Sequence, residues 1–166
     1  MIFVTVGTHE QPFNRLIKSV DMLKGEGKIT EDVVMQIGYS TYEPQHCKWS
    51  KLMAHQTLTE YISNARIVIT HGGPASIFIP LQMMKIPVVV PRQYCYHEHI
   101  NNHQMDFVKK ISVQSDNIIP VYDTDDLYSM ISNYEQIAEK KRTALSCNNQ
   151  IFNQLFIEMV DKLMKN

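Results

Sequence analysis

A short glycine-containing stretch carries residue types whose spacing suits phosphate binding. An apolar segment over 67–69 runs directly into Thr70-His71-Gly72-Gly73, and a helix-like segment begins around 74–76. Glycines at a strand-to-helix turn let a bound group approach the backbone. The free N–H groups and the positive dipole end of the helix then attract an anion. The stretch predicts a pocket for a nucleotide or a sugar nucleotide, and a plain strand-to-helix turn is the alternative.

A histidine-rich segment over 97–104 is the second group of residues that could bind a ligand or take part in catalysis. His99 and His103 are four residues apart, so on a helix they would share a face, as zinc ligands do. Cys95 is the only cysteine close by, and the order H-E-x-x-H of zinc proteases fails at Asn101. No metal site is therefore expected here.

Two further histidines follow predicted strands directly. His9 lies in the loop after the first strand, and an unperturbed pKa near 6.5 suits either hydrogen bonding to phosphate or a role as general base. Capping of the following loop or helix is the alternative for His9. His71 precedes the glycine pair, where it either contacts a diphosphate or makes a structural hydrogen bond that holds the loop.

These residues are positioned by strands that alternate with helices. Apolar strands are predicted at 2–6, 33–37, 66–70, 88–90 and 118–121, with a weaker one at 52–54. Helices are predicted between them, including a short one over 57–64 and one from about residue 75. The pattern predicts an α/β fold with a doubly wound, Rossmann-like parallel sheet. Ligands of such sheets bind beyond the carboxyl ends of the strands. Gly7, Gly38 and Arg92 lie there, as does the turn Thr70-His71-Gly72-Gly73, which we call the glycine turn.

Composition limits the class of protein. The 166 residues fit one domain over 1–166, with the motifs in about 1–110 and a helical part at about 123–166. A formal net charge of −1 gives no basic field for nucleic acid. Three widely spaced cysteines favour a reduced, cytoplasmic setting. The chain starts directly as a strand, and no apolar run is long enough to cross a bilayer, so we expect a soluble protein.

Several segments, taken in order, resemble the C-terminal, donor-binding domain of glycosyltransferase family 28. The resemblance is strongest to short stand-alone members that make bacterial exopolysaccharide or capsule, and to the catalytic subunit of the dolichol-linked GlcNAc transferase. The matching segments span most of the chain up to about residue 110: Phe3-Val4-Thr5-Val6-Gly7-Thr8-His9, Gln36-Ile37-Gly38-Tyr39-Ser40, Ile69-Thr70-His71-Gly72-Gly73-Pro74-Ala75-Ser76-Ile77, Val88-Val89-Val90-Pro91-Arg92 and Glu98-His99-Ile100-Asn101-Asn102-His103-Gln104.

The resemblance implies the donor lobe of a two-lobed GT-B transferase that binds a nucleotide sugar, a UDP-sugar in particular. It implies inverting transfer of a hexose or N-acetylhexosamine to a lipid-linked acceptor in polysaccharide or glycolipid synthesis. Short members recruit the acceptor-binding lobe as a separate, membrane-anchored partner subunit. The chain is then expected at the inner face of the membrane through that partner, with no metal or other cofactor.

The resemblance also implies roles for individual residues. Backbone groups around the glycine turn and the first loop would hold the diphosphate: Gly7, Thr8, Gly72, Gly73, Ala75 and Ser76. Ser76 adds a hydroxyl, for which a helix cap is the alternative. Glu98, Asn102 and Gln104 would bind the sugar, Arg92 would pair with phosphate or Glu98, and His9 and Glu98 are the catalytic candidates. Ile79 stands where many members place a glutamate for the ribose hydroxyls.

Other functions stay open at this point. A non-catalytic subunit that activates a transferase would share the same fold. A Rossmann oxidoreductase is disfavoured because the turn after the first strand lacks G-x-G-x-x-G, and a nucleotide-sugar epimerase needs two lobes. The amphipathic segment over 151–164 predicts a helix that packs on the sheet or docks a partner.

Overall fold

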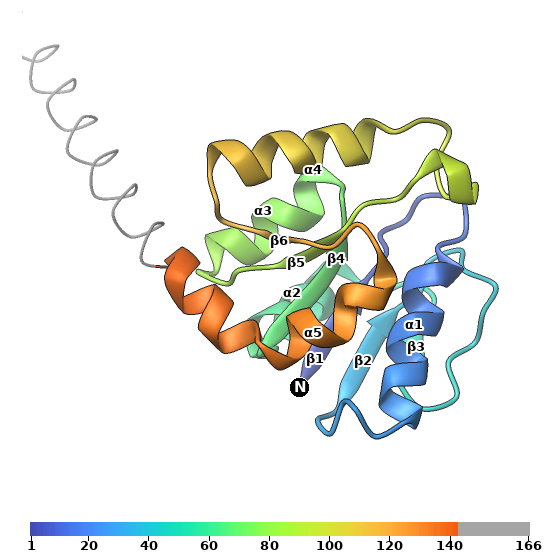
Figure 1. The fold of residues 1–166 in the computed structure, drawn as a ribbon. Coiled ribbons are helices and arrows are strands. Elements are labelled where there is room, and N and C mark those ends of the chain that lie inside the picture. The colour runs from blue at the N-terminus through green and yellow to red at the C-terminus, as the bar shows by residue number, and fades with distance from the viewer. Residues whose placement is uncertain (143–166) are drawn as a thin grey trace, which may run out of the picture.

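The computed structural model describes residues 1–142. Its strands form one parallel sheet in the order β3-β2-β1-β4-β5-β6 (Figure 1). The strands are β1 (Ile2–Thr5), β2 (Val33–Gln36), β3 (Lys48–Ser50), β4 (Ile67–His71), β5 (Val88–Val90) and β6 (Ile119–Pro120). The α-helices are α1 (Asn14–Gly25), α2 (His55–Asn64), α3 (Pro74–Gln82), α4 (His103–Gln114) and α5 (Leu127–Ser132). The predicted doubly wound, Rossmann-like parallel sheet is confirmed.

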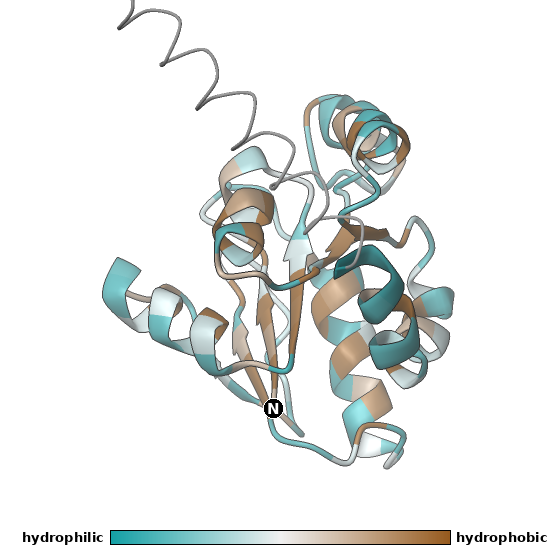
Figure 2. Cartoon of the chain, turned by 90° about the vertical axis from the view of Figure 1, so that its left-hand side faces the viewer, coloured by the Kyte–Doolittle hydropathy of each residue, from teal (hydrophilic) through white to brown (hydrophobic). Residues whose placement is uncertain are grey.

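Helices cover both faces of the sheet, which explains why its central strands are apolar throughout. Ile2 and Val4 of β1 face the side of α1 and α5, whereas Phe3 faces the side of α2. Val89 of β5 packs with Val108 of α4 on that second side. Figure 2 shows the hydrophobic strands between helices whose outer faces are hydrophilic. The core is thereby closed on both sides, and the strand ends are left for the site.

One local prediction is wrong. The strand expected at 52–54 is absent, and β3 lies at Lys48–Ser50, where Trp49 pairs with Met35 of β2. Because β3 is an edge strand with exposed Lys48 and Ser50, it carries no apolar run that would reveal it. The short helix predicted over 57–64 is present as α2, which begins two residues earlier, at His55.

The C-terminal predictions are covered only in part. Short helical segments follow β6, namely the 3-10 turn Thr124–Asp126, α5 and residues 134–142. The helix predicted over 151–164 lies outside the described residues, so the single domain over 1–166 stays a prediction. Among residues 1–142, no helix has both the length and the apolar character needed to cross a bilayer.

Candidate functional site

The candidate site lies where β1 and β4 end side by side. The strand order reverses here, because the chain adds β2 and β3 on one side of β1 and then β4 on the other. Thr5 of β1 pairs with Thr70 of β4, so the loop after β1 and the glycine turn after β4 are neighbours. This is the crevice in which open α/β sheets bind their ligands.

A cavity of about 370 Å³ opens at this crevice, and we call it the phosphate cavity. Its polar side is formed by both loops and the start of α3, and its apolar side by α2 and α3. The lining residues are Thr5, Gly7, Thr8, Gln36, Met53, His55, Leu58, Ile62, His71, Ala75, Ser76 and Ile79. The structure therefore brings together five residues predicted for the site, namely Gly7, Thr8, His71, Ala75 and Ser76.

The first turn of α3 offers backbone donors to this cavity. Gly73 is the N-cap residue, Pro74 has no N–H group, and the N–H of Ile77 already donates to the carbonyl of Gly73. Helix geometry leaves the N–H groups of Ala75 and Ser76 without an intrahelical acceptor. Gly73 has no side chain to cap them, and the hydroxyl of Ser76 lies 3.4 Å from Nε2 of His71. The two N–H groups and the helix dipole together suit an anion.

Gly7 and Gly73 lie against the imidazole ring of His71 from both loops. A Cβ atom at Gly7 would lie 2.5 Å from Cε1 of His71, and a Cβ atom at Gly73 would lie 2.5 Å from Nε2. Gly7 also has a φ of +73°, a conformation that L-residues with a side chain rarely adopt. The buried ring by itself therefore leaves no room for a side chain at Gly7 or Gly73.

We predict that Gly7→Ala costs about 3 kcal/mol of unfolding free energy, from left-handed strain together with overpacking against His71. Gly27→Ala is the matched control, because Gly27 has a φ of +72° and a Cβ atom there would meet nothing within 4 Å. The control is expected to cost about 1 kcal/mol. Urea unfolding of both variants measures the difference, and equal losses would show that the ring does not constrain Gly7.

His71 is held as a neutral imidazole. Burial, together with the nearby positive charge of Arg92, lowers its pKa to about 4, so the ring is uncharged at pH 7. A neutral ring beneath two glycines, with Nε2 near the hydroxyl of Ser76, favours the loop-holding role over charge pairing with a diphosphate.

The buried state of His71 predicts that stability falls in mild acid. The unfolded chain binds a proton at His71 below about pH 6.5, whereas the folded protein does so only near pH 4. Unfolding therefore takes up a proton between these values, and at pH 5 the loss is about 2 kcal/mol relative to pH 7. Urea unfolding at both pH values tests this, and His71→Gln should remove most of the difference.

The side chain of Gln104 makes hydrogen bonds within the protein. Its Oε1 accepts hydrogen bonds from the N–H groups of Gly72 (3.0 Å) and Arg92 (3.1 Å). A Cβ atom at Gly72 would lie 2.9 Å from Cβ of Gln104. Gly72 and Gln104 thus hold the glycine turn against α4. Their direct contact with a donor stays a prediction that this geometry does not favour.

Arg92 and Glu98 are buried supports in this structure. The guanidinium of Arg92 is fully buried and donates to the carbonyls of Val6 and Glu98, and it also donates to that of Gln11. Glu98 is 3% exposed, and its carboxylate pairs with Arg15 and accepts from the N–H of Gln93. The expected pairing of Arg92 with the Glu98 carboxylate is replaced by a bond to its carbonyl. These partners favour positioning over contact with the substrate.

A second cavity, of about 420 Å³, lies on the α4 side of the glycine turn, and we call it the histidine cavity. It is lined by Gly72, Gly73, Pro74, His99, His103, Gln104 and Phe107. The helix α4 begins at His103, so His99 precedes it and the two histidines share no helix face. The four-residue spacing of His99 and His103 therefore does not place them side by side on a helix as zinc ligands. Within residues 1–142 no group of three His, Cys, Asp or Glu side chains is arranged to hold a metal ion.

Comparison with known proteins identifies the family. Residues 1–158 match the C-terminal domain of glycosyltransferase family 28. The chain belongs to this family. No curated protein matches it in sequence.

Solved structures share the fold of this family 28 domain. The glycosyltransferase SnogD from Streptomyces nogalater superposes with a TM-score of 0.54 at 15% identity, over 87% of this chain and 39% of that one. The kitacinnamycin glycotransferase superposes with a TM-score of 0.59 at 15% identity, over 88% of this chain and 39% of that one. The calicheamicin glycosyltransferase CalG4 superposes with a TM-score of 0.56 at 12% identity, over 86% of this chain and 37% of that one. The chain therefore spans about two fifths of the length of these glycosyltransferases.

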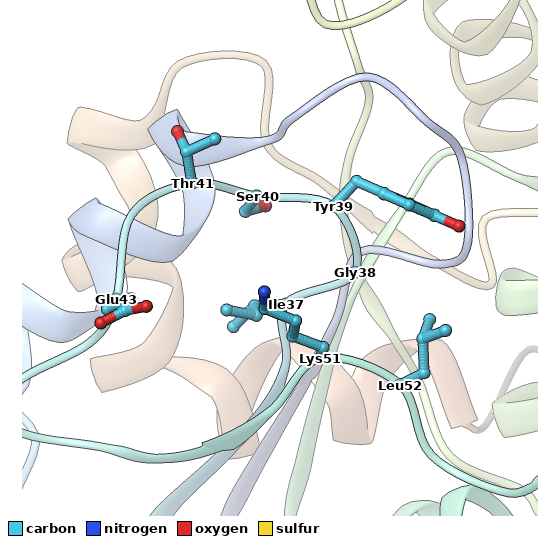
Figure 3. Close-up of a pocket in the computed structure, with 8 residues that line it drawn as sticks. All are labelled: Ile37, Gly38, Tyr39, Ser40, Thr41, Glu43, Lys51 and Leu52. Atoms are coloured by element: carbon cyan, nitrogen blue, oxygen red, sulfur yellow. The ribbon is translucent and has the colours of Figure 1, made fainter.

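The family 28 domain has a third cavity, of about 410 Å³, beside Gly38 (Figure 3). Gly38 has a φ of +55°, and a Cβ atom there would lie 2.6 Å from the carbonyl oxygen of Gly7. The loop that follows is fastened to α1, since Asn14 accepts from the N–H of Thr41 and Asp21 accepts from that of His46. Gly38 thus shapes the sheet edge next to the phosphate cavity.

Sequence reasoning missed the apolar side of the phosphate cavity. Met53, Leu58 and Ile79 line it, and of these the sequence points only to Ile79, which stands where many family members have a glutamate. The signal was present in Leu58 and Ile62, which repeat on one face of α2, the helix that leads into β4.

Asn102 is exposed at the start of α4, where its Oδ1 accepts from the N–H of Tyr94.

Proposed function

We propose that this family 28 domain binds a nucleotide sugar in the phosphate cavity and forms the donor-binding part of a glycosyltransferase. The observation that carries the proposal is the convergence of the loop after β1 with the N–H groups of Ala75 and Ser76 at the reversal of strand order. The donor diphosphate would lie against these groups, and its nucleoside along the apolar side. The cavity volume is that of a small-ligand site.

The finer parts of the proposal rest on the family. The donor is a UDP-sugar, and the reaction is an inverting transfer of a hexose or N-acetylhexosamine to a lipid-linked acceptor. A membrane-anchored partner supplies the acceptor site, as in the short members of the family that the chain resembles. No metal is needed in this proposal, because the helix dipole and the backbone N–H groups stabilise the leaving diphosphate.

Thermal unfolding with added nucleotides tests the proposal. UDP at 100 times its dissociation constant is expected to stabilise the protein by about 2.7 kcal/mol, which raises the melting temperature by about 7 °C. ADP and GDP at the same concentration are the controls for base selectivity. Absence of any shift with UDP or UDP-sugars would overturn the proposal. Co-purification with a membrane protein in that case would support a non-catalytic activating subunit.

A further inference from the structure

The imidazole rings of His9 and His99 are in direct contact. Their centroids lie 4.6 Å apart, and the rings meet edge to face at an interplanar angle of 68°. Thr8, the chain neighbour of His9, lines the phosphate cavity, and His99 lines the histidine cavity. His9 thus follows a residue of the phosphate cavity directly in the chain, interacts electrostatically with His71, which lines that cavity, and contacts a residue of the histidine cavity.

Hydrogen bonds from the backbone define the proton position on both rings. The N–H of Gln11 donates to Nδ1 of His9 (3.3 Å), and the N–H of Asn101 donates to Nδ1 of His99 (3.4 Å). A backbone N–H can only donate, so each Nδ1 carries the lone pair. The single proton of a neutral His9 ring is therefore on Nε2, which makes Nε2 a donor and leaves it unable to accept a proton.

Burial and the nearby charge of Arg92 keep His9 in this neutral form at pH 7. Burial lowers the pKa of His9 most, and Arg92 and the neighbouring His99 lower it further, against a smaller opposing effect of Glu10. His71, on β4, lies close enough to His9 for the two rings to interact electrostatically. The environment around His9 is thus rich in basic groups, which suits a negatively charged ligand.

We propose that His9 donates a hydrogen bond from Nε2 to the donor diphosphate, and that His99 is the positioning residue that holds the His9 ring in this orientation. This inference rests on the proposed function, because it requires a diphosphate in the phosphate cavity. It replaces the role of general base for His9, since the Nε2 that faces away from the Gln11 N–H already carries a proton.

Nitrogen NMR of protein labelled with ¹⁵N-histidine tests the orientation directly, with His9→Gln as the spectrum that assigns the His9 signals. The expected result is an Nε2–H tautomer at pH 7 and a shift of this nitrogen on addition of UDP. His99→Ala should reduce the population of this tautomer, whereas His99→Phe, which keeps an aromatic edge, should retain it. An Nδ1–H tautomer of His9 in the wild type would overturn the inference.

Calorimetric measurement of UDP binding is the second test of the inference. His9→Gln keeps an N–H donor near the position of Nε2 and should bind UDP within about threefold of the wild type. His9→Phe removes the donor and should weaken binding about tenfold or more. His9 is only partly buried, so both variants are expected to fold, which their melting temperatures check.

The outcomes separate this inference from the proposed function. If UDP binds the wild type and His9→Phe equally well, the role of His9 is wrong and the donor site stands. If UDP fails to bind the folded wild type, both proposals fail. If His9→Gln and His9→Phe lose transfer activity equally while binding of UDP is unchanged, His9 acts as a base and the inference is overturned.

Discussion

Ala75→Asp is expected to abolish UDP binding while leaving the protein folded. Ala75 is exposed in the first turn of α3, and its N–H is one of the two donors proposed for the diphosphate. A carboxylate about 4 Å from a phosphate charge costs about 4 kcal/mol at an effective dielectric constant near 20. Affinity should therefore fall about 100-fold or more. The same carboxylate stabilises the start of a helix, so the melting temperature should be unchanged or slightly higher.

Ala75→Asn is the matched control, because asparagine has the shape of aspartate without its charge. Calorimetric titration with UDP should show a loss of about tenfold or less for Ala75→Asn and no measurable binding for Ala75→Asp. Two results would contradict the proposed site. Equal affinity in both variants would place the diphosphate away from α3, and a lower melting temperature of Ala75→Asp alone would show that the loss comes from misfolding.

The parts of the fold that the sequence predicts correctly are those with a local signal. Strands β1, β4 and β5 are runs of apolar residues buried on both faces, and such runs are visible without knowledge of their neighbours. The glycine turn also has a local signal, since a strand, two glycines and a helix follow one another directly. The edge strand β3 has no such signal, because its side chains are partly exposed.

The roles of the charged residues depend on partners that are distant in sequence. Glu98 pairs with Arg15, which is 83 residues away, and Arg92 bonds the carbonyl of Val6, 86 residues away. From the sequence alone, a charged residue in a loop at the sheet edge resembles a ligand contact. Only the fold shows that these charges are buried, with Glu98 paired to Arg15 and Arg92 hydrogen-bonded to backbone carbonyls. The tautomer of His9 likewise depends on the N–H of Gln11, whose direction follows from the loop conformation.

Arg92→Met is expected to cost about 4 kcal/mol of unfolding free energy, the largest loss predicted for a single side chain here. The guanidinium donates to three carbonyls, those of Val6 and Gln11 in the loop after β1 and that of Glu98, at 2.9, 2.7 and 3.0 Å, and it packs 4.8 Å over the ring of Phe13. Methionine fills part of the volume but leaves buried carbonyls without donors. Burial lowers the pKa of Arg92 to about 10, so the charge is present at pH 7.

The Arg92 variant separates a supporting role from a ligand contact. If Arg92 bound phosphate directly, Arg92→Met would lower UDP affinity with little change in urea unfolding, because a ligand contact is absent from the free protein. Since Arg92 instead ties the loop that carries His9 to the loop that carries His99, we expect a large loss of stability together with loss of the His9–His99 contact. Arg142→Met is the control, because Arg142 pairs at 3.5 to 3.8 Å on the surface, and it should cost within about 1 kcal/mol.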